Sequence, residues 1–214
     1  MSISKAILDV LEQSSWIRKM FEEGIQLKKE FGEKNIFDLS LGNPLLEPPE
    51  KFKKKLIELS NSDEKGLHRY MPNQGFQSTR EKVANSLAKE SNFPITSEEL
   101  IITTGAAGGV NAILKSILNP NDEIIVFSPF FVEYLFYIKN HNGIPVIAKT
   151  DENFFPDLSD LSKKITKNTK GIIINSPNNP TGVLYPIEII EKIGEILSSK
   201  EKELGTEIYL ISDE

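Results

Sequence analysis

The sequence contains no cysteine. This absence excludes disulfides, thiolate nucleophiles, iron–sulfur clusters and cysteine-ligated zinc, and it is compatible with a reducing cytoplasm, where we expect the protein to be. Histidine is nearly as scarce, because the chain has only His68 and His141. These two residues lie far apart in the sequence and lack the spacing of metal ligands. The sequence therefore predicts no metal site.

An excess of positive charge is also lacking. The 25 Lys and Arg residues are outnumbered by 31 Asp and Glu residues, which gives a formal net charge of −6. A nucleic-acid groove needs a basic stripe, and the one dense basic run, residues 51–56, is typical of an amphipathic helix with a solvated face. Nucleic acid is therefore not an expected partner.

Long apolar runs are missing as well. No stretch approaches the roughly 18 apolar residues that a membrane-spanning helix requires. The apolar run at the N-terminus carries Asp9 and Glu12, so it does not have the form of a signal peptide. We expect neither a membrane partner nor secretion.

The second half of the chain has a regular alternation of apolar and amphipathic segments. From residue 100 onward, nearly continuous apolar segments alternate with amphipathic ones, which is typical of a mostly parallel sheet with helices on both faces. We expect strands at 100–104, 123–128, 144–150, 170–175 and 207–212. Upstream we expect helices at 16–31, 51–59 and 78–90 and a short strand at 36–42. We predict an N-terminal arm and small-lobe segment over residues 1–45 and an α/β domain over residues 46–214.

Ligands of open α/β sheets bind outside the carboxyl ends of the strands, and four of the expected strands deliver distinctive residues there. In chain order these are the small-residue loop 105–109, the pair Phe130 and Phe131, the loop "SPNNPTG" at 176–182, and Asp213. Each has an ordinary alternative: a tight turn, a core contact, an Asn-Pro turn or a helix cap. Taken together, they fit a ligand with a phosphate, a flat ring, an acceptor oxygen and a basic ring nitrogen. Pyridoxal 5′-phosphate (PLP) has all four.

Six segments extend this interpretation to a family. They are "LSLGNPLLEPPE" (39–50), "RYMPNQGFQSTRE" (69–81), "TTGAAGGVNAIL" (103–114), "SPFFVEY" (128–134), "NSPNNPTGVLY" (175–185) and "YLISDE" (209–214). In these segments and in their order the chain resembles the class I/II aminotransferases, which are PLP-dependent enzymes of fold type I. The resemblance implies the large domain of that fold, an N-terminal arm belonging to a smaller lobe, and a homodimer with shared sites.

The resemblance also implies roles for individual residues. Asp213 would be the catalytic carboxylate that faces the pyridine nitrogen and keeps it protonated. Asn179 would donate its amide to the ring oxygen, with Pro180 and Gly182 fixing the loop and Asn178 supporting the turn, and Phe131 would stack on the ring. The remaining expected contacts are Gly105, Ala106 and Ala107 with the phosphate, Tyr70 with the phosphate of the neighbouring subunit, and Gly42 with the substrate carboxylate. Many relatives carry polar side chains in the phosphate loop, whereas the two alanines here offer only their backbone.

In the family, the lysine that forms the Schiff base lies C-terminal to the position of Asp213, and no lysine of this chain does. We therefore expect a truncated portion of an enzyme, without the C-terminal part, that alone neither folds compactly nor transaminates. In the absence of later strands, "IYLI" (208–211) would be an exposed apolar edge.

The implied function is transfer of an amino group between an amino acid and a 2-oxo acid. A PLP-dependent C–S lyase and a non-catalytic remnant or binding protein are the alternatives. A nicotinamide dehydrogenase is disfavoured, because the G-x-G-x-x-G pattern is missing.

Overall fold

The computed structural model describes residues 3–39, 42 and 46–214, which form two compact units, Met1–His68 and Arg69–Glu214. The boundary predicted near residue 45 falls inside the first unit. Residues 43–45 lie outside the described residues, and the predicted division at this point stays a prediction.

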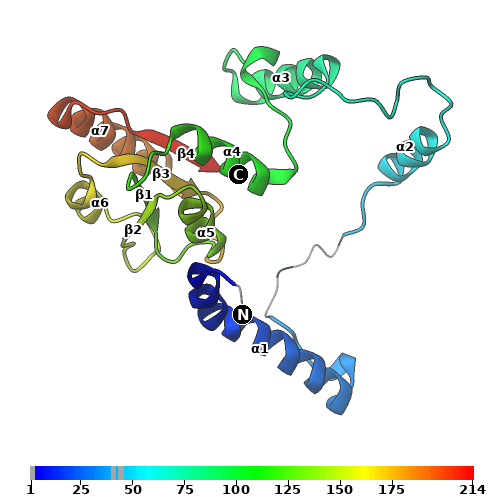
Figure 1. Ribbon diagram of the computed structural model, residues 1–214, viewed down its shortest axis with the longest axis horizontal. Helices are drawn as coiled ribbons and strands as arrows, with labels where there is room; N and C mark the ends of the chain where they lie inside the picture. Colours follow the sequence, from blue (N-terminus) through cyan, green and yellow to red (C-terminus); the bar gives the residue numbers. More distant parts are fainter. Residues whose placement is uncertain (1–2, 40–41, 43–45) are drawn as a thin grey trace. The chain divides into compact units, whose positions relative to one another are not determined.

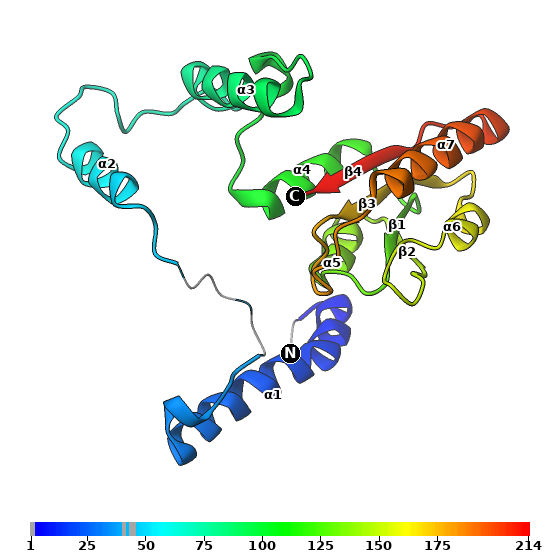
Figure 2. The same cartoon turned by 180° about the vertical axis from the view of Figure 1, so that it is seen from behind.

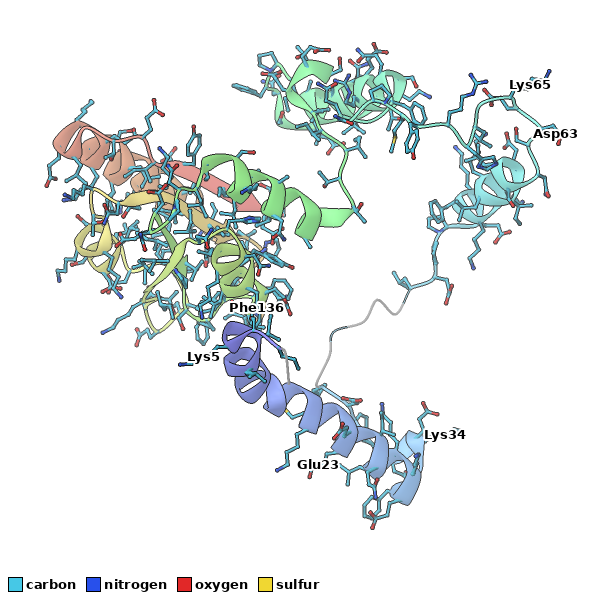
Figure 3. The ribbon with its side chains drawn as sticks, in the orientation of Figure 1. Lys5, Glu23, Lys34, Asp63, Lys65 and Phe136 are labelled. Atoms are coloured by element: carbon cyan, nitrogen blue, oxygen red, sulfur yellow. The ribbon has the colours of Figure 1, made fainter. Side chains whose placement is uncertain are left out.

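The described residues of the first unit form helices α1 (Lys5–Phe31) and α2 (Glu50–Ser60), with a 3₁₀ turn, η1 (Glu33–Asn35), after α1. Helix α1 begins well before the predicted start at residue 16, because the Ser4 hydroxyl caps it by accepting the Ile7 N–H at 3.3 Å. It ends at Gly32, whose φ of 87° suits a residue without a Cβ. Glu23 and Lys34 point away from the ribbon (Figure 3). Helix α2 confirms the predicted basic helix.

The strand expected at 36–42 is wrong for the residues that can be described. Residues 36–39 and 42 form no strand, and residues 40 and 41 lie outside the described residues. The apolar side chains Phe37 and Leu39 are about nine-tenths exposed, at 90% and 93%. Alternation predicts a strand only where a neighbour supplies the backbone hydrogen bonds, and the described residues provide no such neighbour.

The second unit is built on a four-stranded sheet of order β2-β1-β3-β4 (Figure 1). All the pairings are parallel, and the strands are β1 (Glu123–Phe127), β2 (Ile144–Ala148), β3 (Thr169–Asn175) and β4 (Tyr209–Asp213). β3 is central and pairs with β1 and β4. The predicted parallel α/β sheet is thus confirmed, and four of the five strands expected after residue 100 are present.

Helices cover both faces of this sheet, as the alternating pattern predicted. One apolar core joins the sheet to α6 (Leu158–Lys164) and α7 (Ile187–Leu204) through Ile125, Leu161, Ile172, Ile174, Ile193 and Leu197. The other joins it to α4 (Gly105–Ile117) and α5 (Glu133–Asn140) through Val110, Leu114, Ile124, Tyr134, Ile138, Ile173 and Ile211. Neighbouring side chains on β3 therefore enter opposite cores, because strand residues alternate between faces.

The strand expected at 100–104 is also wrong. Leu100 has extended backbone, with φ −114° and ψ 138°, but residues 100–104 join no ladder in the described part of the chain. Ile101 instead lines an apolar groove of about 490 Å³ between α4 and β4. β4 is one of the two edge strands, and its Tyr209 and Leu210 are exposed, which agrees with the expected apolar edge.

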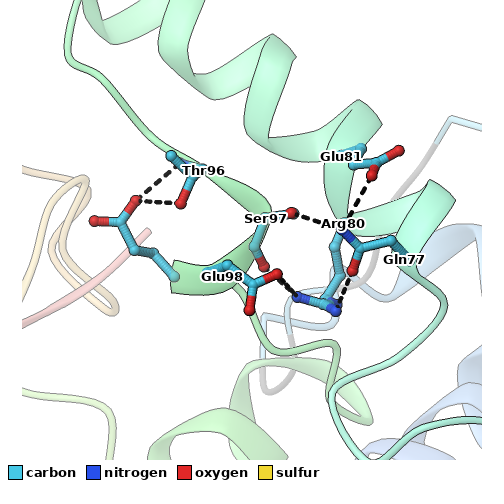
Figure 4. Close-up of polar contacts among 7 residues, drawn as sticks. Gln77, Arg80, Glu81, Thr96, Ser97 and Glu98 are labelled. Carbon is cyan, nitrogen blue, oxygen red and sulfur yellow. Dashed lines mark hydrogen bonds and ion pairs between the residues drawn. The ribbon is translucent and has the colours of Figure 1, made fainter.

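Upstream of the sheet, helix α3 (Gln77–Ser91) is tied to the 3₁₀ turn η2 (Ser97–Glu99) by the buried Arg80 (Figure 4). The Arg80 guanidinium donates hydrogen bonds to the Ser97 carbonyl and the Gln77 side chain, and it lies 3.8 Å from a Glu98 carboxylate oxygen. Burial of a charged group requires such partners. Helix α3 confirms the helix predicted at 78–90.

Candidate active site

The direction of the chain reverses between β1 and β3, which places a candidate site at their carboxyl ends. From β1 the chain moves to the edge strand β2, then crosses back to β3 on the other side of β1. Crevices form at such switch points in open α/β sheets, and ligands bind there. The residues that lie at this rim are those after β1 (128–131), the loop after β3 (176–182) and the end of β4.

Asp213 ends β4 and lies opposite Asn175, the last residue of β3, in the parallel register. Its side chain is half-buried, and its Oδ2 accepts a hydrogen bond from the hydroxyl of Tyr134 on α5. Its Oδ1 has no hydrogen-bond partner among the residues that the structure describes. One carboxylate oxygen is thus held by the protein, and the other can accept a proton-bearing nitrogen of a ligand.

The Asn175 side chain connects β4 to the loop after β3. Its Nδ2 donates to the backbone carbonyl of Asp213 at 2.7 Å, and its Oδ1 accepts the backbone N–H of Asn179 at 2.6 Å. Asp213 and Asn179 are therefore both bonded to one side chain. The structure places these two predicted site residues at the same end of the sheet.

Within the loop, the two neighbouring asparagines differ in their environment. Asn178 is buried, and its Oδ1 accepts the Thr181 hydroxyl at 2.9 Å. The N–H of Gly182 donates to the Asn178 carbonyl at 2.7 Å, where Gly182 has a φ of +73°. Asn179 is exposed, and its side-chain amide makes no hydrogen bond within the described chain. The turn is thus built on Asn178, which leaves the amide of Asn179 available to a ligand.

Aromatic side chains line the rim beside Asp213. The Phe131 ring meets Tyr134 edge to face, with centroids 5.5 Å apart and an interplanar angle of 85°. Tyr137 also packs against Tyr134, with centroids 6.5 Å apart and an interplanar angle of 66°. Phe131 is only partly buried against the α4/α5 core. It therefore takes part in the core, as the ordinary alternative proposed, and keeps some surface exposed at the rim.

Burial raises the pKa of the Tyr134 phenol, and the hydrogen bond to Asp213 raises it further. Burial also raises the pKa of Tyr137 and Tyr185. A neutral Tyr134 donates a hydrogen bond to Asp213, whereas a phenolate would repel the carboxylate. The hydroxyl is therefore held in its neutral, donating form.

This shift predicts the response of stability to alkaline pH. In the unfolded chain tyrosine ionises near pH 10, whereas folded Tyr134 resists ionisation, so the stabilisation is present below about pH 10 and is lost as the pH rises further. We expect the free energy of unfolding, measured by urea denaturation, to fall between about pH 9.5 and pH 11. Tyr134→Phe should make the free energy of unfolding fall less steeply with pH, although Tyr137 and Tyr185 will still contribute to the fall. An unchanged slope in Tyr134→Phe would contradict the assigned environment.

The expected phosphate contacts lie in the first turn of α4. Gly105, with a φ of +71°, donates its N–H to the Thr103 carbonyl at 3.0 Å, so this N–H is not free for a ligand. Ala106 and Ala107 follow it and are exposed, and N–H groups in a first helical turn lack intrahelical acceptors. Helix α4 lies next to β4, because Ile113 and Ser212 line the same groove, and the C-terminus projects close to the start of α4 in both views (Figures 1 and 2). The phosphate-loop residues thus begin the helix that lies next to β4.

The structure does not bring the last two predicted residues into this arrangement. Tyr70 is fully exposed and makes no hydrogen bond within the described chain. Gly42 belongs to the first unit and is exposed, with neighbours at 40–41 and 43–45 that lie outside the described residues. The roles of Tyr70 and Gly42 stay predictions.

Sequence reasoning assigned no role to Asn175 or Tyr134, which hold the predicted residues in place. Both fall inside segments that carry the family resemblance, at the first and last positions of "NSPNNPTGVLY" (Asn175) and "SPFFVEY" (Tyr134). No cluster of three or more potential metal ligands occurs in the described residues, and none of the described helices is both long and apolar enough to cross a bilayer.

Comparisons with known proteins agree with this geometry. The chain is 33% identical over 182 residues to the aspartate/prephenate aminotransferase of Thermus thermophilus, covering 84% of this chain and 45% of that protein. It is 32% identical to the aspartate aminotransferase of Pyrococcus horikoshii, covering 96% of this chain and 49% of that protein. An amino transferase structure from Eubacterium rectale superposes with a TM-score of 0.93 at 31% identity, covering all of this chain and 54% of that one.

The chain thus spans about half the length of the curated relatives that it matches. The model of the family "Aminotransferase class I and II" matches residues 34–214, which include every strand of the sheet and the whole rim. The chain belongs to the class I and II aminotransferase family.

Proposed function

We propose that this chain forms the cofactor-binding part of a PLP-dependent aminotransferase. The observation that carries the proposal is the link through Asn175, which holds Asp213 and Asn179 at one end of the sheet. A carboxylate oxygen and an amide, both free of protein partners in the described chain, suit the ring nitrogen and ring oxygen of one pyridine.

The residues present fit the cofactor's groups. Asp213 would accept the ring N–H, Asn179 would donate to the ring oxygen, and Phe131 would contact the ring. The free N–H groups of Ala106 and Ala107 would bind the phosphate, assisted by the positive end of the helix dipole. When bound, PLP supplies an electron sink for the electron pair left at the α-carbon of an amino acid.

The chain's own contribution is charge placement. Asp213 would hold a proton on the ring nitrogen through a charge-assisted hydrogen bond, and the Tyr134 hydroxyl holds the carboxylate that would do so. Asn179 would stabilise negative charge on the ring oxygen. The loop 176–182 and Phe131 would position the ring between them.

We also propose the whole protein's partners and location. Relatives named aspartate and aspartate/prephenate aminotransferases support an amino acid and a 2-oxo acid as the substrates. The whole protein would be a homodimer in which Tyr70, fully exposed in this chain, reaches the partner's cofactor. A chain without cysteine is compatible with the cytoplasm.

The test uses pyridoxamine 5′-phosphate (PMP), the amine form of the cofactor, because its binding requires no covalent bond to a lysine. Once a cooperative urea transition has shown that the chain is folded, we expect it to bind PMP in titration calorimetry about 10-fold or more tightly than pyridoxamine, which lacks the phosphate. NADH should not compete. Absence of PMP binding, or equal affinity for the two compounds, would contradict the proposal.

A further inference from the structure

The Asn175 side chain is bonded to two of the residues proposed to contact the cofactor ring, Asp213 and Asn179, although it was not expected to contact the ring itself. Its amide donates to the Asp213 carbonyl at 2.7 Å, and its oxygen accepts the Asn179 N–H at 2.6 Å. A primary amide can donate on one side and accept on the other, which neither a carboxylate nor an apolar side chain of that size can do. The position therefore uses both functions of asparagine.

The two bonds act on different segments. Asp213 lies at the end of an edge strand, where β4 has a neighbour on one side only. Asn179 lies in an exposed loop, where its own amide has no partner in the described chain. Neither segment is fixed by the other directly. The Asn175 side chain, which extends from the central strand β3, is bonded to both of them.

We infer that Asn175 is a positioning residue that sets the separation between the carboxylate of Asp213 and the amide of Asn179, and so tunes the protonation of a bound pyridine ring. This inference rests on the proposed function. Loss of the Asn175 side chain frees the loop and the strand end to move apart, which weakens both ring contacts together. A residue with only a structural role would change stability without changing the charge state of the bound ring.

The test compares Asn175→Ala with Asn168→Ala. Asn168 precedes the opposite end of β3, is exposed, and makes no side-chain hydrogen bond within the described chain. We expect Asn175→Ala to weaken PMP binding about 10- to 30-fold, which is the effect of losing two ordinary hydrogen bonds, and Asn168→Ala to leave it unchanged. Failure of the unmutated chain to bind PMP would reject the proposed function. Binding by that chain with equal affinities in the two variants would reject this inference alone.

A spectroscopic measurement separates positioning from stability. The near-ultraviolet absorption of bound PMP is followed against pH, with protein in saturating excess so that nearly all the PMP is bound, to obtain the pKa values of its ring groups. In the unmutated chain we expect a raised ring-nitrogen pKa and a lowered ring-oxygen pKa relative to free PMP, because Asp213 and Asn179 favour the charged forms. In Asn175→Ala both values should return toward those of free PMP. Values that stay unchanged would overturn the inference.

Two further variants test whether Asn175 affects PMP binding through its bonds to Asp213 and Asn179. Asn175→Asp keeps the acceptor for the Asn179 N–H and loses the donor to Asp213, so it should retain more affinity than Asn175→Ala. Asn175→Asp also allows the inference to be tested if Asn175→Ala fails to fold. In an Asn179→Ala background, Asn175→Ala should reduce PMP affinity less than it does alone, because the effects of residues that act through one another are not additive. Full additivity would show that Asn175 does not act through Asn179.

Discussion

Asp213→Ala is expected to weaken PMP binding about 10- to 100-fold, because a hydrogen bond to a charged group contributes about 1.5–3 kcal/mol. The carboxylate is the only acidic side chain that the proposal places at the ring. Its Oδ2 is held by Tyr134, and its Oδ1 is free of partners in the described chain. Removing it leaves a ring nitrogen without a counter-charge and a buried tyrosine hydroxyl without its acceptor.

Titration calorimetry with PMP measures this effect, and Glu214→Ala provides the matched control. Glu214 is the adjacent carboxylate, exposed and bonded to the Ser212 hydroxyl at 3.0 Å. Its removal takes away the same charge one residue further along, so it tests whether net charge near the rim explains the loss. Equal losses in the two variants would remove Asp213 from the proposed site.

Asp213→Asn refines this prediction. The amide keeps the size of the side chain and a hydrogen bond to Tyr134, but it carries no negative charge. The ring nitrogen of bound PMP should then titrate at a lower pH than in the unmutated chain, because the opposite charge that favoured the protonated form is gone. Such a shift would show that position 213 supplies charge rather than shape.

The arrangement of the second unit could be predicted because the apolar composition of its segments and their strand or helix periodicity point to the same fold. The run 171–174 is apolar and mostly β-branched, and the helix after Pro186 carries an apolar face, so strand and helix periodicities are distinct there. The rule that ligands bind at carboxyl ends of parallel strands then predicted that Asp213 and Asn179 share one end of the sheet. The structure does place them there, bonded to one side chain.

The two strands that are absent show the limit of local patterns. Residues 100–104 have β-branched side chains and extended backbone at Leu100, as a strand would. A strand also needs a neighbour, and the described residues supply none at that position. Pairing is a property of the whole sheet, which a five-residue pattern cannot report. Residues 36–39 fail for the same reason.

Asn175 and Tyr134 were missed for a different reason. A polar residue at the end of a strand and a tyrosine in an amphipathic helix are both ordinary in sequence, so neither marks a site. Their importance appears only in three dimensions, where α5 brings Tyr134 to Asp213 across 79 residues of sequence. The residues proposed to contact the ligand lie in or next to loops with distinctive sequences. The residues that position them, such as Asn175 and Tyr134, can be identified only from their contacts in the structure.

The stability of this arrangement depends on β3, because its side chains enter both cores and its last residue is Asn175. Ile172 is completely buried among α6, α7 and the sheet. We expect Ile172→Ala to lower the free energy of unfolding by about 2–5 kcal/mol, the usual cost of removing large buried aliphatic groups and leaving a cavity. Urea denaturation followed by far-ultraviolet circular dichroism measures it.

Ile187→Ala is the matched control, since Ile187 begins α7 and is 63% exposed. The same atoms are removed there without leaving a cavity, so the free energy of unfolding should change by no more than about 0.5 kcal/mol. Because Ile172 lies three residues before Asn175 on one rigid strand, its loss should also weaken PMP binding at temperatures where the variant begins to unfold. A cooperative transition in the unmutated chain, with Ile172→Ala and Ile187→Ala equally stable, would mean that the two-sided core does not hold the sheet together. The absence of any cooperative transition would instead bear out the expectation that the chain alone does not fold compactly.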